Sequence, residues 1–210
     1  MSTADLIASM RELESGQISD ALEEAGLGAR VLTGFTRLGT KAGPMIGPAV
    51  TVQQRLKTSD EPRTQRMVRH REVSDGIAGP GDVVVIATGG HLGASTWGEN
   101  HAMRCAVRAV EGCLTDGAVR DAETLNLARA SVFCRGFSPV KSMWTMVTES
   151  INQPVVIDGV TIRPGDIIFA DRTGTIVIPA EHLAHVACMA HKIRKRELEN
   201  QTRLLPDRAP

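Results

Sequence analysis

The amino-acid sequence predicts a single α/β domain built on a mixed β-sheet. Its middle third alternates short apolar runs with helical segments, the pattern of parallel strands joined by right-handed crossovers. The apolar run 83–87 has no polar alternation, which is typical of a strand covered on both faces. The final third has short strands joined by turn residues, among which Asp158-Gly159 is a strong hairpin signal. No linker divides the 210 residues, so we expect one domain over residues 1–210.

The N-terminal region, residues 1–28, is expected to contain two helices. Leu6 and Met10 share one face of the first helix, Ser19 is the predicted N-cap of the second, and Gly26 is its stop. Downstream we expect, in chain order, a strand at 47–52, a helix in the Arg-rich segment 57–72, a strand at 83–87, a helix over about 96–111, a strand at 113–115, a short helix and a strand near 132–134. The last third is predicted to form strands at 155–157, 160–162, 167–170 and 175–178, and then a C-terminal helix over 180–205.

The composition limits the classes of partner. The 24 basic and 24 acidic residues cancel, so no overall field attracts nucleic acid or an anionic membrane. Four Phe, two Trp and no Tyr leave few rings on which bases could stack, which disfavours single-stranded nucleic acid as a ligand. The first residues have no apolar signal-peptide core, and no apolar run approaches the roughly 18 residues of a membrane span. We therefore expect a cytoplasmic protein that binds neither nucleic acid nor membrane.

Two short motifs carry side chains suited to chemistry. Gly98-Glu99 follows the loop after the buried strand, and Arg120-Asp121 follows the next strand. If these strands are parallel neighbours, Glu99, Arg120 and Asp121 converge, because the loops after parallel strands meet at one edge of the sheet. An arginine can hold a carboxylate by two parallel hydrogen bonds, and one carboxylate with waters and substrate oxygens can hold Mg²⁺. The motifs therefore indicate a cation-assisted site for a 2-oxo acid.

Each of these features also has a structural interpretation. Most Arg-Asp pairs are surface ion pairs, and Glu99 alone would be an acid favoured by the helix dipole in a first turn. His91 and His101 flank the motifs and are either proton-transfer groups or ordinary helix-surface and capping residues. The basic segment 63–71 is either a solvated helix face or a wall that selects a polycarboxylate by charge. Lys141 is a further candidate of that kind.

Six segments resemble a known family when they are taken together. In order they are Ile46-Gly47-Pro48-Ala49-Val50-Thr51-Val52, Gly79-Pro80-Gly81-Asp82-Val83-Val84-Val85, Gly98-Glu99, Asp116-Gly117-Ala118-Val119-Arg120-Asp121, Arg135-Gly136-Phe137-Ser138-Pro139 and Arg163-Pro164-Gly165-Asp166. They resemble the RraA-like family, which includes class II 4-hydroxy-4-methyl-2-oxoglutarate/4-carboxy-4-hydroxy-2-oxoadipate aldolases and the ribonuclease E inhibitor RraA. The resemblance runs over about residues 18–195. It implies a swivelling β/β/α-type fold and a ring-shaped homotrimer, sometimes paired into a hexamer, with sites between subunits.

The resemblance also implies which residues hold the metal ion and the substrate carboxylate. Asp121 would be the direct metal ligand, and Arg120 would clamp the carboxylate of the pyruvyl group. The family uses a further acid from the C-terminal helix of the neighbouring subunit, which acts on the metal through a water. Glu197 is the predicted equivalent, in preference to Glu199.

The remaining implied roles belong to four consecutive residues. Backbone N–H groups of Asn100 and His101, next to Gly98, would hold substrate oxygens, and His101 is also a candidate acid or base. Glu99 would orient the metal-bound water that transfers the proton. The family aldolases have an Asp at the position of Glu99, 21 residues before Arg120, so this chain departs from their pattern there.

The sequence and the resemblance together lead us to expect a metal-dependent lyase. It would cleave a 4-hydroxy-2-oxo (poly)carboxylic acid by a retro-aldol reaction and release pyruvate, with Mg²⁺, Mn²⁺ or another divalent cation. Oxaloacetate decarboxylation is the expected side activity. Two alternatives stay open: a non-catalytic, ribonuclease-binding regulator of the RraA type, and a metal-dependent decarboxylase, dehydratase or hydrolase acting on another oxo acid.

Overall fold

The structure is a computed structural model that describes residues 1–128 and 131–204. Its helices are α1 (Thr3–Ser9), α2 (Ser15–Glu24), α3 (His70–Glu72), α4 (Glu99–Val107), α5 (Ala122–Leu127) and α6 (Leu183–Leu204). Its strands are β1 (Val31–Leu32), β2 (Thr36–Leu38), β3 (Met45–Leu56), β4 (Val83–Ala87), β5 (Ser95–Trp97), β6 (Gly112–Val119), β7 (Ser131–Phe137), β8 (Met146–Ile151), β9 (Val155–Ile157), β10 (Val160–Ile162), β11 (Ile167–Ala170) and β12 (Thr175–Ile178). Short 3₁₀ helices occupy Met10–Glu12, Ser142–Trp144 and Ala180–His182, and Val73–Ile77 is a π-helical turn. None of the helices in these described ranges is both long and apolar enough to cross a membrane.

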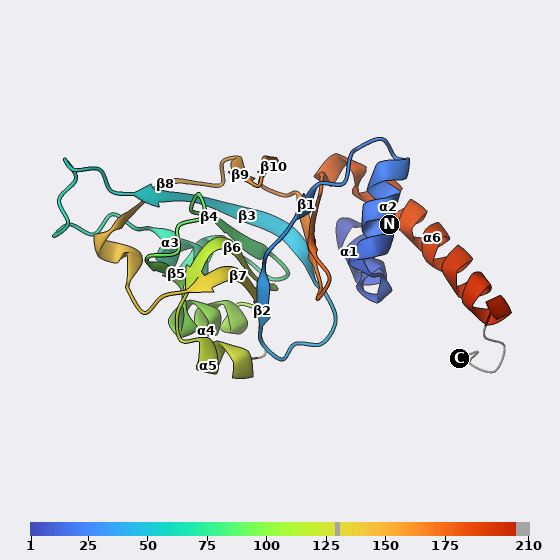
Figure 1. Cartoon of the computed structure of the whole chain (residues 1–210), viewed down its shortest axis with the longest axis horizontal. Helices are drawn as coiled ribbons and strands as arrows, with labels where there is room; N and C mark the ends of the chain where they lie inside the picture. The colour runs from blue at the N-terminus through green and yellow to red at the C-terminus, as the bar shows by residue number, and fades with distance from the viewer. Residues whose placement is uncertain (129–130, 205–210) are drawn as a thin grey trace.

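Ten strands of the described residues form one mixed sheet (Figure 1). The order along it is β1-β12-β11-β3-β4-β6-β7-β2, with β5 beside β6 and β8 beside β3. Strands β3, β4, β6 and β7 are parallel neighbours, whereas β8 and β11 pair with β3 in antiparallel orientation. Strands β9 and β10 form a separate hairpin around Asp158-Gly159. The predicted α/β fold with a mixed sheet, its parallel crossovers and this hairpin are confirmed.

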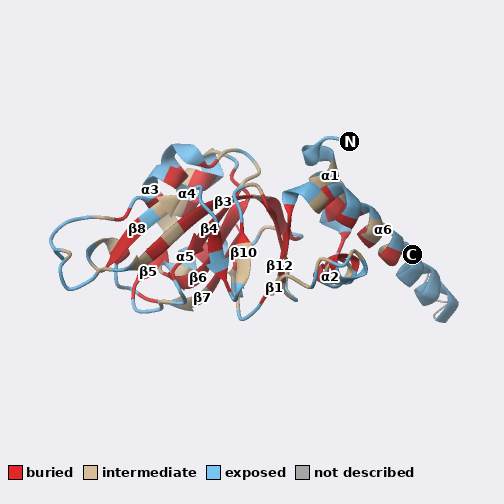
Figure 2. Cartoon of the chain, turned by 90° about the horizontal axis from the view of Figure 1, so that it is seen from above, coloured by how far each residue is buried: buried red, intermediate tan, exposed pale blue. Residues whose placement is uncertain are grey.

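The parallel centre of the sheet is buried on both faces, as the apolar run predicted. Val84 and Ile86 of β4 pack into the cluster that includes side chains of α4 and α5. Val83, Val85 and Ala87 pack on the other face, in the cluster that includes the β9–β10 hairpin. Figure 2 shows the buried residues concentrated in the strands between these layers. Because both faces are covered, successive residues of β4 are all apolar.

A third apolar cluster joins α1, α2 and α6 to β11 and β12, at the end of the molecule away from α4 and α5 (Figure 1). Ile18 and Leu22 of α2 and Val186 of α6 pack there against Phe169 of β11. The two predicted N-terminal helices are therefore confirmed. The predicted N-cap is wrong: Ser19 lies inside α2, whose N-cap is Glu14.

The predicted end of the second N-terminal helix and the predicted C-terminal helix are also found. Gly26 follows α2 with φ = 71°, a left-handed conformation that glycine adopts without steric cost. The C-terminal helix is confirmed over 183–204, preceded by a 3₁₀ turn, and residue 205 lies outside the described residues.

The helix predicted in the Arg-rich segment 57–72 is wrong, because only its last residues, His70–Glu72, are helical. The backbone of this segment is held instead by β8, a strand that was not predicted. The N–H of Thr148 donates to the carbonyl oxygen of Met67 at 3.1 Å, and the N–H of Arg69 donates to the Thr148 hydroxyl at 2.9 Å. Backbone groups paired with a strand are not available for helical hydrogen bonds.

The helix predicted from about residue 96 begins later. Ser95–Trp97 pairs with the end of β6 as the short strand β5, and α4 covers Glu99–Val107. Conversely, the strand predicted at 113–115 extends to Val119. Arg120 and Asp121 therefore follow directly from the end of β6, and Gly98 separates β5 from α4. The two motifs therefore follow neighbouring parallel strands, as expected, but the strand before Gly98-Glu99 is β5, which was not predicted.

Candidate active site

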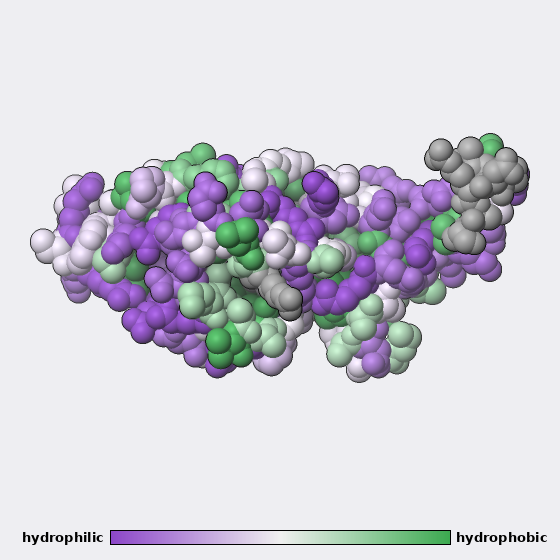
Figure 3. Space-filling view, turned by 90° about the horizontal axis from the view of Figure 1, so that it is seen from below, coloured by the Kyte–Doolittle hydropathy of each residue, from purple (hydrophilic) through white to green (hydrophobic). Residues whose placement is uncertain are grey.

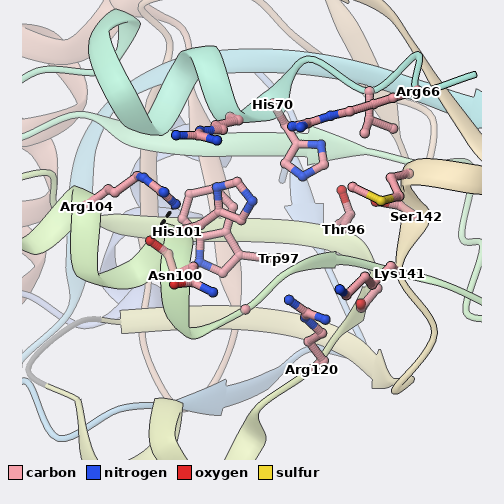
Figure 4. Close-up of a pocket in the computed structure, with 15 residues that line it drawn as sticks. Arg66, His70, Thr96, Trp97, Asn100, His101, Arg104, Arg120, Lys141 and Ser142 are labelled. Atoms are coloured by element: carbon pink, nitrogen blue, oxygen red, sulfur yellow. Dashed lines mark hydrogen bonds between the residues drawn. The ribbon is translucent and has the colours of Figure 1, made fainter.

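A cavity of about 260 Å³ opens where the ends of β5 and β6 meet the start of α4 (Figure 4). This volume lies just below the usual range of roughly 300 to 1,000 Å³ for ligand sites, so the cavity suits a small molecule. Four separate segments contribute to its walls, namely residues 66–71, residues 95–104, Arg120 and residues 141–143. The site therefore depends on contacts between parts of the chain that are distant in sequence.

The two motifs pack tightly together because residue 98 has no side chain. The N–H of Arg120 donates to the carbonyl oxygen of Trp97 at 3.0 Å, which joins the end of β6 to β5. A Cβ atom at Gly98 would lie 2.8 Å from Oδ2 of Asp121 and 3.0 Å from Cγ of Arg120. Those distances are shorter than van der Waals contacts allow. Glycine at this position therefore lets Arg120 reach the cavity.

Asp121 is turned away from the helix that it precedes. It is the N-cap residue of α5, yet its carboxylate does not cap that helix. Instead Oδ2 accepts the backbone N–H of Glu99 at 3.2 Å and lies 3.5 Å from Nε of Arg120. Its φ of 57° is uncommon for a residue other than glycine, and such conformations concentrate at functional sites. With 35% of its side chain exposed, Asp121 keeps free carboxylate surface at the N-terminus of α4.

Gly98, Asn100, His101 and Arg120 line the cavity, whereas Glu99 lines a neighbouring hollow between α4 and α5. The backbone N–H of His101 donates to the carbonyl oxygen of Gly98 at 3.1 Å. This donor is already engaged, so the imidazole is the group that His101 offers to a ligand. The N–H of Asn100 has no hydrogen-bond partner within the described ranges, as is usual in a first helical turn.

A buried polar chain holds His70 in the wall. The amide nitrogen of Gln54 lies 2.6 Å from Nδ1 of His70 and 3.3 Å from the Thr148 hydroxyl. The amide oxygen of Gln54 accepts the Thr96 hydroxyl at 2.5 Å, which sets the orientation of the amide. Gln54 therefore donates to Nδ1, and the proton of the His70 ring is on Nε2. In a protonated His70 ring, the Nδ1–H would face the N–H of the Gln54 amide, so two donors would lie against each other.

His101 lies at the centre of the cavity wall (Figure 4). Its ring stacks on Trp97 with 4.9 Å between centroids and lies 4.7 Å from the ring of His70. Nδ1 is 2.9 Å from the Ser74 hydroxyl, which itself donates to the carbonyl oxygen of Arg71 at 3.0 Å. Because Ser74 uses its one proton on that carbonyl, it accepts the Nδ1–H of His101. This tautomer leaves Nε2 unprotonated, so His101 can accept a proton.

The cavity is strongly cationic. Arg66, Arg71, Arg104, Arg120 and Lys141 line it, and none of the described carboxylates does. Asp75 pairs with both Arg71 and Arg104, at 2.9 Å and 2.7 Å, and Asp121 lies beside Arg120. Two neighbouring carboxylates thus offset five cations, and the site retains an excess of positive charge. An anionic ligand is the chemistry that this arrangement favours.

The donor set suits an oxygen-bound cation held mainly by water and substrate. Within residues 1–128 and 131–204, no three His, Cys, Asp or Glu side chains gather as a closed metal site would require. Mg²⁺ commonly uses one or two protein carboxylates and completes its shell with waters and substrate oxygens. Asp121 fits that role. Glu197 lies on α6, well away from α4 and α5 (Figure 1), where its Oε2 accepts from Gln17 at 2.6 Å, so its part in the site stays a prediction about a neighbouring subunit.

Sequence reasoning did not find Gln54, Thr96 or Trp97 as members of the site, and it included His70 only as part of the basic segment 63–71, which was one of two interpretations of that segment. Gln54 did carry a signal. It follows Val50 and Val52 at the same two-residue spacing along β3, and like them it is buried, although it is polar. A buried amide requires hydrogen-bond partners, which are often functional groups. His70 gave no such signal, since its neighbours in the sequence are mostly charged.

The buried histidines make the stability of the protein depend on pH. Burial lowers the pKa of His70 to about 3, helped by the charges of His101 and Arg66. Burial and the charge of Arg104 lower the pKa of His101 to about 4. Histidines of an unfolded chain titrate near pH 6.5. Between that pH and the native pKa values, the unfolded chain binds protons that the folded protein does not. The free energy of unfolding therefore has its full value above about pH 6.5 and decreases as the pH falls.

We expect the free energy of unfolding to decrease by roughly 1 kcal/mol per pH unit through His70 as the pH falls from about 6.5 to about 5. His70→Gln should remove this part of the slope, and His185→Gln, at an exposed position of α6, should leave it unchanged. Urea unfolding at a series of pH values measures the slope. Identical slopes for the wild type and His70→Gln would contradict the assignment.

The comparisons with known proteins agree with this fold. The family description RraA-like (Aldolase/RraA) matches residues 15–177. A protein of Halalkalibacterium halodurans named "Putative 4-hydroxy-4-methyl-2-oxoglutarate aldolase" is 30% identical over 199 residues, which cover 95% of this chain and 87% of that protein. Protein DlpA of Legionella pneumophila is 30% identical over 195 residues, but the chain spans only 30% of the length of DlpA.

A solved structure supports the same relationship at the level of the fold. Streptomyces coelicolor RraAS2, described as an unusual member of the RNase ES inhibitor RraA protein family, superposes with a TM-score of 0.81 at 24% identity. The match covers 95% of this chain and 97% of that one. The family match over most of the chain, with the relative of similar length, shows that this protein belongs to the RraA-like family.

Proposed function

We propose that this protein is a divalent-metal-dependent lyase that cleaves a 4-hydroxy-2-oxo (poly)carboxylic acid by a retro-aldol reaction and releases pyruvate. The observation that carries the proposal is the cationic cavity, in which Arg120 lies beside the partly exposed carboxylate of Asp121. The names of several relatives as putative aldolases support the reaction class. Decarboxylation of oxaloacetate is the proposed side activity, because it passes through the same pyruvate enolate.

Arg120 is proposed to bind the carboxylate next to the keto group. Its guanidinium presents parallel N–H donors that match both oxygens of a carboxylate, and the tight packing on Gly98 limits its movement. Asp121 would hold the divalent cation at the edge of the same cavity, with the N–H of Asn100 free to donate to a substrate oxygen. A cation held there would stabilise the negative charge that develops on the keto oxygen when the carbon–carbon bond breaks.

His101 is the proposed acceptor of the proton from the 4-hydroxyl group. Loss of this proton turns C4 into a carbonyl carbon, the C3–C4 bond breaks, and its electron pair is left on C3 in conjugation with the keto group. Protonation of C3 then completes pyruvate. An anionic substrate among the arginines would raise the low pKa of His101 and so strengthen it as a base. Glu99 stays a candidate for this step, through a water.

The test is an assay for pyruvate release. The protein is incubated with a panel of 4-hydroxy-2-oxo diacids and triacids and with oxaloacetate, in the presence of Mg²⁺ or Mn²⁺ and, in parallel, after exhaustive EDTA treatment. We expect cation-dependent release of pyruvate from at least one hydroxy-oxo acid. Turnover that survives removal of all divalent cations would refute the metal-dependent mechanism.

The same panel separates the alternatives. Cation-dependent turnover of another oxo acid by decarboxylation, dehydration or hydrolysis, without aldol cleavage, would favour the second enzyme class. Capture of a large ribonuclease by a protein that turns over none of these acids would favour a regulator of the RraA type.

We further propose a homotrimer, alone or paired as a hexamer. Met103 and Val107 of α4 and Leu127 of α5 are largely exposed, and Figure 3 shows apolar side chains gathered on the face that these helices form. Exposed apolar patches of this kind commonly mark protein interfaces. Analytical ultracentrifugation should show three or six chains per particle.

A further inference from the structure

The wall of the cavity opposite Arg120 carries positive charge that the 2-oxo acid end of a substrate would not use. Figure 4 shows Arg66 and His70 on this wall, across the cavity from Arg120 and Lys141. Arg66 forms no ion pair with any residue of the described ranges. Its charge is therefore available to a ligand.

The neighbouring cations are only partly neutralised. Arg71 and Arg104 share the single carboxylate of Asp75, whose two oxygens lie 2.9 Å and 2.7 Å from their Nε atoms. One acid for two guanidinium groups leaves one positive charge beside that of Arg66. The wall thus holds about two charges that an anion could neutralise.

His70 adds a hydrogen-bond donor to this charge. Gln54 donates to Nδ1 of His70, so Nε2 carries the ring proton. The Gln54 amide is itself oriented by Thr96 and Thr148, which makes the tautomer a consequence of the buried chain rather than of the solution pH. A neutral N–H beside an arginine suits one oxygen of a carboxylate or phosphoryl group.

The wall is held in place by the sheet. The N–H of Thr148 in β8 donates to the carbonyl oxygen of Met67, and the hydroxyl of Thr148 accepts the N–H of Arg69 at 2.9 Å. Thr148 also contacts Gln54, so one residue of β8 positions both the backbone around Arg66 and the ring of His70. A binding surface fixed in this way loses little freedom when a ligand binds.

We propose that Arg66 and the Nε2–H of His70, supported by Arg71 and Arg104, form a second anion subsite that selects oxo acids with a second anionic group remote from the keto end. This inference rests on the proposed function, in which Arg120 holds the first carboxylate. The second group is a carboxylate or a phosphoryl group. The subsite makes the chain selective against simple monocarboxylic oxo acids.

Calorimetric titration with unreactive ligands tests the subsite without turnover. In the presence of Mg²⁺, pyruvate supplies the 2-oxo acid end alone, 2-oxoglutarate adds a second carboxylate, and 2-oxo-4-phosphonobutyrate adds a phosphoryl group instead. We expect one of the two dianionic ligands to bind on the order of tenfold more tightly than pyruvate, and the tighter one identifies the group. Arg66→Gln should lose most of this preference with unchanged affinity for pyruvate. Arg63→Gln, an exposed arginine of the same segment outside the cavity, is the matched control and should behave as wild type.

Equal affinities of the wild-type protein for pyruvate and both dianionic ligands would overturn the subsite, as would an equal loss of all three in Arg66→Gln. A preference for dianions in a protein without lyase activity would refute the proposed function and leave the subsite intact. Lyase activity without a preference for dianions would refute the subsite and leave the proposed function intact.

Nitrogen NMR of the imidazole rings tests the role of His70 separately. We expect the Nε2–H tautomer of His70 between about pH 5 and pH 8, with a shift of this resonance on binding of the dianionic ligand and little change with pyruvate. The Nδ1–H tautomer, or a resonance that no dianion moves, would remove His70 from the subsite.

Discussion

Asp121→Asn should lose divalent-cation binding and pyruvate release together. Asparagine keeps the shape of the side chain and can still accept the N–H of Glu99, but it lacks the negative charge that holds a cation. We expect kcat to fall by on the order of 10² or more, because stabilisation of the developing charge is worth several kcal/mol. Titration with Mn²⁺, followed by water-proton relaxation, measures the cation, and the pyruvate assay measures turnover.

Glu123→Gln is the matched control for this variant. Glu123 is an exposed acid in the first turn of α5, two positions after Asp121, and it does not line the cavity. Its removal should change neither cation affinity nor turnover. Full turnover in Asp121→Asn, or cation affinity equal to that of the wild type, would contradict the assignment of Asp121 as the ligand.

Arg120→Lys should also be severely impaired even though it preserves the charge. Lysine is a point charge on a flexible stem and cannot match both oxygens of a carboxylate as the planar guanidinium does. The packing of Arg120 on Gly98 adds to this, because the shape of the arginine stem fits the space that glycine leaves. We expect a loss on the order of 10² or more in kcat/KM, together with weaker binding of pyruvate as a ligand.

Steady-state kinetics and calorimetry with pyruvate measure the two effects of Arg120→Lys. Arg63→Lys, at an exposed position outside the cavity, provides the control and should be indistinguishable from the wild type. Normal kcat and KM in Arg120→Lys would exclude the clamp. Loss of turnover with normal pyruvate affinity would place the role of Arg120 in the transition state alone.

Much of the fold could be predicted because it depends on residues close together in the chain. The uninterrupted apolar run of β4 identified a strand buried on both faces, and Asp158-Gly159 identified a hairpin from the turn alone. The prediction failed for the segment 57–72, whose charged composition resembles a solvated helix. Its backbone is held by β8, some 80 residues away, and no local pattern reports that pairing.

The candidate site could likewise be predicted only in part. Arg120 was expected near the Gly98-Glu99 motif because loops that follow neighbouring parallel strands meet at one edge. Asn100 and His101 were added by the resemblance to the RraA-like family, and Gly98, Asn100, His101 and Arg120 all line the cavity. Glu99 was expected there too, but it lines the hollow between α4 and α5. The direction of a side chain in a first helical turn depends on packing, which the connectivity of the strands does not specify.

The sequence by itself determined the order of the strands and helices in the parallel centre, the hairpin, the edge of the sheet where Arg120 and Asp121 lie, and the membership of the RraA-like family. Only the tertiary structure decided between the two interpretations of the basic segment 63–71, because it places Arg66 and His70 across the cavity from Arg120. His70 receives its tautomer from Gln54, 16 residues earlier, and Gln54 is held by Thr148, 94 residues later. Strand patterns and turns arise from interactions between adjacent residues, whereas the protonation and charge of this wall arise from groups that meet only when the sheet has formed.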